Sequence, residues 1–158
     1  AGGVRAPIVG RNRNRGRKPN CLVELAGNGA MDNKHALIID DDAYNVYVMQ
    51  RFLDKENISY TTITETSTLE DTLSQLDSVD IVLLDLEMPR RDGYEIIEVL
   101  KQRLPAGVPI VACTVHTAEV NRTRKLGFSG FIAKPLDMDR FSEQVRRILN
   151  GEPIWEAR

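Results

Sequence analysis

The sequence predicts an α/β fold, a three-layer αβα sandwich built on a five-stranded parallel sheet. Short apolar runs alternate along the chain with segments whose apolar residues recur at helical spacing. The run at residues 81–84 (IVLL) is short and continuously aliphatic, as expected for a strand that is buried on both faces. Because the connections are short and crossovers between parallel strands are right-handed, helices should cover both faces of the sheet.

Five segments are predicted as strands. The second of them is rich in β-branched and aromatic residues, which favour strands. Cys113, inside the fourth, is expected to be a small buried apolar residue. The predicted strands cover, in chain order, residues 36–40, 59–64, 80–84, 110–114 and 129–133.

Helical periods fill the gaps between these strands. The first helix follows Asp42 and runs to about residue 56. Ser67 and Glu70 fit a capping box, in which each side chain would bond to the other residue's backbone at the start of the second helix. The third helix opens at Asp92 and ends before Pro105.

The last two predicted helices differ in character. The segment 117–125 is polar almost throughout, so we expect a short, weakly anchored helix that ends at Gly127. Residues 141–149 carry a clear apolar face, and Ile154 and Trp155 are expected to fold back onto the body of the domain.

Composition narrows the class of protein. A chain of 158 residues can bury one sizeable core, and no apolar run approaches the length needed to cross a bilayer. Cys21 and Cys113 are far apart, which indicates neither a disulfide framework nor a zinc site. We therefore expect a cytoplasmic protein.

Residues 1–30 differ from the rest of the chain. They carry six basic side chains and one acidic one, whereas residues 31–158 carry 15 basic and 22 acidic. They lack a helical or strand period, so a disordered basic leader outside the folded domain (31–158) is predicted. A nucleic-acid-binding arm is the alternative, but no aromatic residue interrupts the basic run, and Met31 is a plausible natural start.

Polar side chains end four of the predicted strands. Because the carboxyl ends of parallel strands meet at one sheet edge, these residues should converge. Three carboxylates that lie close together repel one another unless a cation enters, and oxygen ligands alone suit Mg²⁺. A lysine and a hydroxyl beside them favour an anion such as a phosphoryl group. The residues are Asp40, Asp41, Asp85, Thr114 and Lys134.

Asp85, which follows the 81–84 run, is the natural acceptor for such a group, since an aspartate can form an acyl phosphate. The simpler alternative is that Asp85 caps the next helix. That alternative leaves the other acids and the lysine unexplained.

Four motifs together resemble the receiver domain of the two-component response regulator family. They are residues 37–42 (LIIDDD), 81–89 (IVLLDLEMP) with 92–93 (DG), 109–114 (PIVACT) and 130–135 (GFIAKP). Their order and spacing carry the resemblance, which covers residues 31–158. It implies the flavodoxin-like strand order 2-1-3-4-5.

The resemblance also implies roles for individual residues. Asp85 would accept a phosphoryl group from a sensor histidine kinase or a histidine phosphotransfer protein, and Lys134 would pair with the phosphoryl oxygens. Mg²⁺ would be bound by Asp41, Asp85, the main-chain carbonyl of Glu87 and, through water, Asp40. The Lys134–Pro135 peptide would be cis.

Thr114 and Phe131 would act as the switch. Thr114 would move toward the phosphoryl group and Phe131 would swing inward, which would change the surface made by the fourth helix, fifth strand and fifth helix. Taken alone, either residue could simply belong to the core. Val115 stands where the family usually has alanine, and with the acid Glu87 it is expected to slow attacking water and prolong the phosphorylated state.

The sequence is compatible with several functions. The preferred one is a stand-alone, non-enzymatic receiver that signals to an unknown protein target, without nucleic-acid or membrane binding by the folded domain. The alternatives are a receiver cut from a hybrid histidine kinase, a Mg²⁺-dependent phosphohydrolase with an aspartate nucleophile, and a receiver that binds partners without being phosphorylated. His35 and His116 are expected to face solvent rather than to take part in catalysis.

Overall fold

The computed structural model describes residues 9–10 and 31–156, which form a seven-stranded sheet flanked by helices. The order is β1-β3-β2-β4-β5-β6-β7, and all neighbours from β3 to β7 run parallel. The strands are β1 (Val9–Gly10), β2 (His35–Ile39), β3 (Ser59–Ile63), β4 (Ile81–Leu84), β5 (Ile110–Thr114), β6 (Gly130–Ala133) and β7 (Ile154–Glu156).

The five predicted strands are β2 to β6, and their order in the sheet confirms the expected 2-1-3-4-5 arrangement. The prediction of five strands was wrong in its count, because a short strand is added at each edge. β1 pairs antiparallel with β3, and β7 pairs parallel with β6. Ile154 and Trp155 therefore do fold back, as part of a strand.

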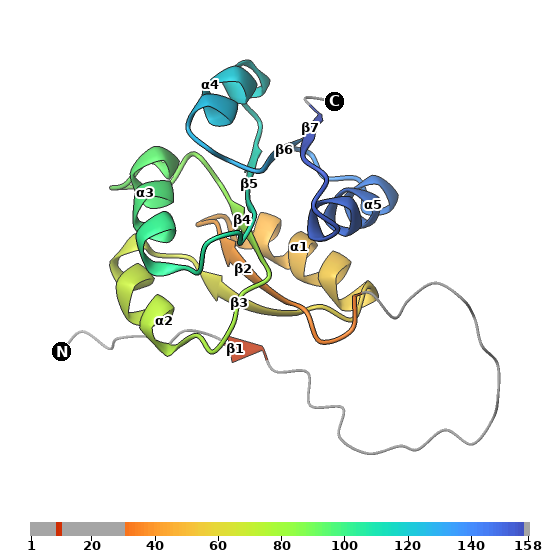
Figure 1. The fold of residues 1–158 in the computed structure, drawn as a ribbon, viewed down its shortest axis with the longest axis horizontal. Coiled ribbons are helices and arrows are strands. Elements are labelled where there is room, and N and C mark those ends of the chain that lie inside the picture. Colours follow the sequence, from red (N-terminus) through yellow and green to blue (C-terminus); the bar gives the residue numbers. More distant parts are fainter. Residues whose placement is uncertain (1–8, 11–30, 157–158) are drawn as a thin grey trace.

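Figure 1 shows α1 and α5 on one face of the sheet and α2, α3 and α4 on the other. Single 3-10 turns, Thr66–Thr68 and Thr117–Glu119, precede α2 and α4. The α-helices are α1 (Ala43–Lys55), α2 (Leu69–Gln75), α3 (Gly93–Arg103), α4 (Val120–Lys125) and α5 (Met138–Leu149).

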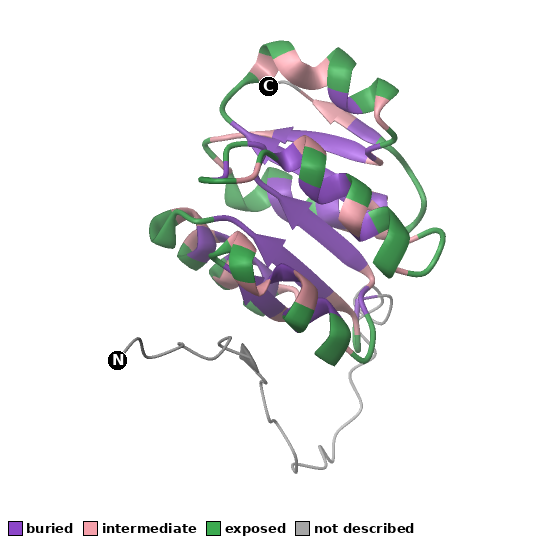
Figure 2. Ribbon diagram, turned by 90° about the vertical axis from the view of Figure 1, so that its left-hand side faces the viewer, coloured by how far each residue is buried: buried purple, intermediate pink, exposed green. Residues whose placement is uncertain are grey.

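The strand side chains alternate between two apolar cores. Figure 2 shows the central strands buried between exposed helix faces. Ile38 and Leu83 pack toward α1 and α5, whereas Leu37 and Leu84 pack toward α2 and α3. Cys113 is fully buried in the first of these cores, and burial raises the pKa of its thiol to about 12.

Side-chain caps fix where the helices begin. Asp42 accepts a hydrogen bond from the backbone N–H of Asn45 at the start of α1, and Asp92 accepts from those of Tyr94 and Glu95 at the start of α3. Gly127 follows α4 with a φ of +86°, a conformation that glycine adopts freely.

The predicted capping box at Ser67 and Glu70 is wrong. The chain turns through the 3-10 segment Thr66–Thr68 before α2, whose N-cap residue, Thr68, makes no side-chain capping bond. Glu70 instead accepts a hydrogen bond from the Arg91 guanidinium at 2.9 Å.

Of residues 1–30 the structure describes only Val9–Gly10, which form β1, and the rest of the predicted leader, Cys21 included, lies outside the described residues. Within the described residues, no helix combines the length and hydropathy needed to span a bilayer. The cytoplasmic location stays a prediction.

Candidate functional site

The strand ends bring four predicted site residues to one edge of the sheet. Asp40 follows β2, Asp85 follows β4, Thr114 is the last residue of β5 and Lys134 follows β6. The backbone pairing of β2 with β4 extends to this edge, since the N–H of Asp85 donates to the Ile39 carbonyl at 2.8 Å. The parallel register therefore positions side chains that are far apart in the sequence.

Asp40, Asp41 and Asp85 form a compact acidic cluster. Each offers an oxygen within 4.8 Å of the others. Asp40 is fully buried, Asp85 is buried and Asp41 is exposed, so the cluster opens to solvent on one side. Three carboxylates at this spacing, with oxygen ligands alone, fit a hard divalent cation such as Mg²⁺.

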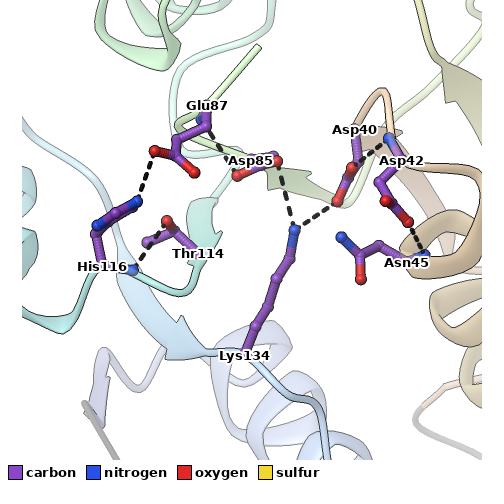
Figure 3. Close-up of polar contacts among 8 residues, drawn as sticks. All are labelled: Asp40, Asp42, Asn45, Asp85, Glu87, Thr114, His116 and Lys134. Atoms are coloured by element: carbon purple, nitrogen blue, oxygen red, sulfur yellow. Dashed lines mark hydrogen bonds and ion pairs between the residues drawn. The ribbon is translucent and has the colours of Figure 1, made fainter.

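Lys134 bridges two of these acids (Figure 3). Its side chain is only 6% exposed, and its Nζ lies 2.7 Å from Oδ2 of Asp40 and 3.4 Å from Oδ2 of Asp85. Burial disfavours the charged lysine, but the hydrogen bond to Asp40 and the charges of both acids raise its pKa overall. Lys134 is therefore a fixed cation beside Asp85.

Backbone N–H groups complete the polar contacts of the acids. The N–H of Asp42 donates to Oδ1 of Asp40 at 2.9 Å, and that of Glu87 donates to Oδ1 of Asp85 at 3.2 Å. Burial raises the pKa of Asp85, and the charge of Lys134 partly offsets this effect. A buried, backbone-anchored carboxylate beside a lysine is held in a fixed orientation and can act as a nucleophile.

Thr114 and Phe131, the predicted switch residues, are both fully buried. The Thr114 hydroxyl accepts a hydrogen bond from the N–H of His116 at 3.3 Å. Phe131 already lies inside the core that faces α2 and α3. A swing from an exposed position is therefore not needed to bring its ring into the core.

The side chain of Glu87 forms a contact that the sequence reasoning missed. Its Oε1 lies 2.5 Å from Nε2 of His116, and both side chains are more than half exposed. A signal was present, since each residue lies two positions after a strand-end site residue, Asp85 or Thr114. The prediction that His116 faces solvent is confirmed.

His35, predicted to face solvent, is only partly exposed. Its ring lies between the hydroxyls of Ser59, 2.7 Å from Nδ1, and Thr61, 2.8 Å from Nε2. The alternative of Asp85 as a helix cap is also wrong, because Asp92 caps the following helix. The predicted cis peptide between Lys134 and Pro135 is confirmed.

Comparison with known proteins gives one consistent match. Residues 36–146 match the family described as response regulator receiver domain. The chain is 31% identical over 128 residues to a hybrid signal transduction protein of Dictyostelium discoideum, covering 76% of this chain and 7% of that protein. It is 32% identical over 124 residues to a protein-glutamate methylesterase/protein-glutamine glutaminase of Myxococcus xanthus, covering 77% and 36%.

Solved structures agree on the fold. The receiver domain of a sensor histidine kinase from Pseudomonas aeruginosa, which has a magnesium ion coordinated in its active-site cleft, superposes with a TM-score of 0.64 at 21% identity, covering 75% of this chain and 98% of that one. Full-length FixJ from B. japonicum gives a TM-score of 0.66 at 27% identity, covering 75% and 59%. The chain spans no more than half the length of the curated relatives it matches.

Proposed function

The chain belongs to the response regulator receiver family, and on that premise we propose that it receives a phosphoryl group on Asp85 from a phosphohistidine. The donor would be a sensor histidine kinase or a histidine phosphotransfer protein. The observation that carries the proposal is the buried contact of Lys134 with both Asp40 and Asp85 beside the exposed Asp41.

The transfer exchanges one bond to phosphorus for another. A carboxylate oxygen of Asp85 forms the new P–O bond, while the P–N bond of the donor breaks and the donor imidazole regains a proton. Lys134 provides a fixed positive charge for the phosphoryl oxygens. The Thr114 hydroxyl, one strand away, is the expected donor to one of those oxygens.

The acidic cluster requires a cation before an anion can approach. Asp40, Asp41, Asp85 and the main-chain carbonyl of Glu87 would hold Mg²⁺, which would supply positive charge that neutralises the phosphoryl oxygens. Asp40 already contacts Lys134 and the Asp42 N–H, which supports the expectation that it acts on the cation through water. Asp41, exposed and without such contacts among the described hydrogen bonds, is free to bind directly.

The signal would leave the domain through the surface formed by α4, β6 and α5. Thr114 ends β5, and Phe131 lies on the adjacent strand β6, which is hydrogen-bonded to β5. A movement of Thr114 can therefore be transmitted to Phe131 through the pairing of these two strands.

The phosphohydrolase alternative requires an acid/base at position 87. The Glu87 carboxylate is exposed and paired with His116, and among the ion pairs of the described residues Lys134 contacts Asp40 and Asp85 but not Glu87. This geometry favours a phosphoacceptor over a hydrolase. Turnover of a generic phosphoester by the purified protein would revive the alternative.

Intact mass spectrometry tests the proposal. The protein is incubated with a small acyl phosphate in the presence of Mg²⁺ or of a chelator. We expect one added phosphate only when Mg²⁺ is present, and none on Asp85→Ala. Asp92→Asn is the matched control, because it alters a carboxylate that caps α3 outside the cluster. Equal labelling of Asp85→Ala would refute the assignment.

A further inference from the structure

The short strand β7 covers the edge of β6 and is itself the last strand of the sheet. Ile154, Trp155 and Glu156 lie in register with Gly130, Phe131 and Ile132 of β6. Without β7, β6 would present a row of unpaired backbone groups between α4 and α5. Figure 1 shows β7 beside β6 on the side of the sheet where α4 and α5 lie.

Gly130 permits this close approach. A Cβ at that position would lie 3.0 Å from the Ile154 carbonyl oxygen, tighter than ordinary contact. Ile154 is 2% exposed and packs into the core between the sheet and α5, which includes Ile148. β7 is therefore packed against the domain as well as hydrogen-bonded to it.

The other two residues of β7 connect it to the helices on either side. Arg124 of α4 places its guanidinium carbon 4.7 Å from the centre of the Trp155 ring, a cation–π contact. The Glu156 carboxylate accepts hydrogen bonds from Arg140 at 3.0 Å and Gln144 at 2.8 Å, both on α5. β7 thus spans the face made by α4, β6 and α5.

We propose that β7 is a strap over this face, and that phosphorylation of Asp85 loosens it and uncovers the edge of β6. This inference rests on the proposed function, because the release step requires the phosphorylated state. Trp155 touches the two parts expected to move: it lies opposite Phe131 in the ladder and beneath Arg124 of α4. A shift of α4 against β6 breaks the Arg124–Trp155 contact.

The strap is suited to local opening. β7 has three residues, of which only Ile154 is buried, and α4 has six, of which only Thr123 is buried. Segments with few buried contacts open at a small free-energy cost. Release of β7 would leave the rest of the sheet intact, since β7 pairs only with β6 among the described strands.

The single tryptophan of the chain makes the strap measurable, because Trp155 is the only source of tryptophan fluorescence. The full chain is compared with Arg124→Gln and with Arg122→Gln, a control whose guanidinium stacks on Tyr94 instead, at 3.8 Å. Each protein is measured with Mg²⁺, with and without a small acyl phosphate. The readouts are acrylamide quenching of Trp155, hydrogen exchange of the amides of residues 154–156, and intact mass.

We expect phosphorylation to speed exchange in β7 about tenfold, on the scale of one lost cation–π contact, and to increase quenching. Arg124→Gln should show faster exchange before phosphorylation, and Arg122→Gln should behave as the parent protein. Unchanged exchange in protein whose mass includes phosphate would overturn the strap and leave the proposed function standing. Equal behaviour of the two variants would also overturn it. Absence of added phosphate on the parent would instead refute the proposed function, and the release step with it.

Discussion

Replacing Lys134 with methionine should destabilise the protein far more than removing a surface lysine. Asp40 is fully buried, and its two oxygens contact only the Lys134 ammonium, at 2.7 Å, and the Asp42 N–H, at 2.9 Å, among the described hydrogen bonds. Lys134→Met leaves that carboxylate buried without a counter-charge, which costs about 3–5 kcal/mol of unfolding free energy. Lys55→Met is the matched control: its ion pair with Asp139 is exposed, and such a pair contributes about 0–1 kcal/mol.

The assay is urea unfolding at neutral pH without divalent cations, with the denaturant slope used to check that the variants unfold alike. A second variant, Lys134→Met in an Asp40→Asn background, should recover part of the loss, because the buried charge is gone. A loss below about 1 kcal/mol for Lys134→Met, equal to that of Lys55→Met, would refute the reasoning. So would a full loss that persists in the Asp40→Asn background.

Three further substitutions probe the surroundings of the site. Gly93→Ala places a Cβ 2.7 Å from the Leu86 Cα. The free energy of unfolding should therefore fall by about 1–3 kcal/mol, and phosphorylation should become slower. An unchanged urea midpoint would argue against this packing. Tyr94→Phe removes the hydrogen bond to Glu119 and should cost about 0.5–1.5 kcal/mol. Burial and that hydrogen bond raise the pKa of Tyr94 to about 12. The loss of unfolding free energy caused by Tyr94→Phe should therefore be constant below about pH 10 and become smaller as the pH rises further. Urea unfolding at several pH values checks this dependence. Val115→Ala should shorten the lifetime of the phosphorylated state, measured by decay of the added mass, and an unchanged half-life would contradict a shielding role for Val115.

The sheet and most of the site could be predicted because burial leaves a strong sequence signal. Strands covered on both faces are continuously apolar, so the polar residues that end them, such as Asp40, Asp85 and Lys134, are conspicuous. Parallel pairing then brings those ends together without any further assumption. The cap at Asp92 was equally readable, because it depends on neighbours in the sequence.

The contacts that were missed depend on partners distant in the sequence. β7 was not predicted as a strand because three residues are too few to show an alternating pattern. Glu70 fitted a local cap but pairs with Arg91 of the loop before α3, a tertiary contact that overrides the local pattern. His35 was predicted as exposed because only the pairing of β2 with β3 places the Ser59 and Thr61 hydroxyls beside its ring.

The central claim is that Asp85 itself becomes phosphorylated, and mapping the modified residue tests it most directly. The protein is treated with Mg²⁺ and a small acyl phosphate, and then with borohydride, which reduces an aspartyl phosphate to homoserine. Peptide mass spectrometry then locates the change. We expect homoserine at position 85 alone, although Asp40 and Asp41 offer carboxylate oxygens within 4.8 Å of an Asp85 oxygen. Homoserine at either of those positions, or at none in protein that carries phosphate, would contradict it.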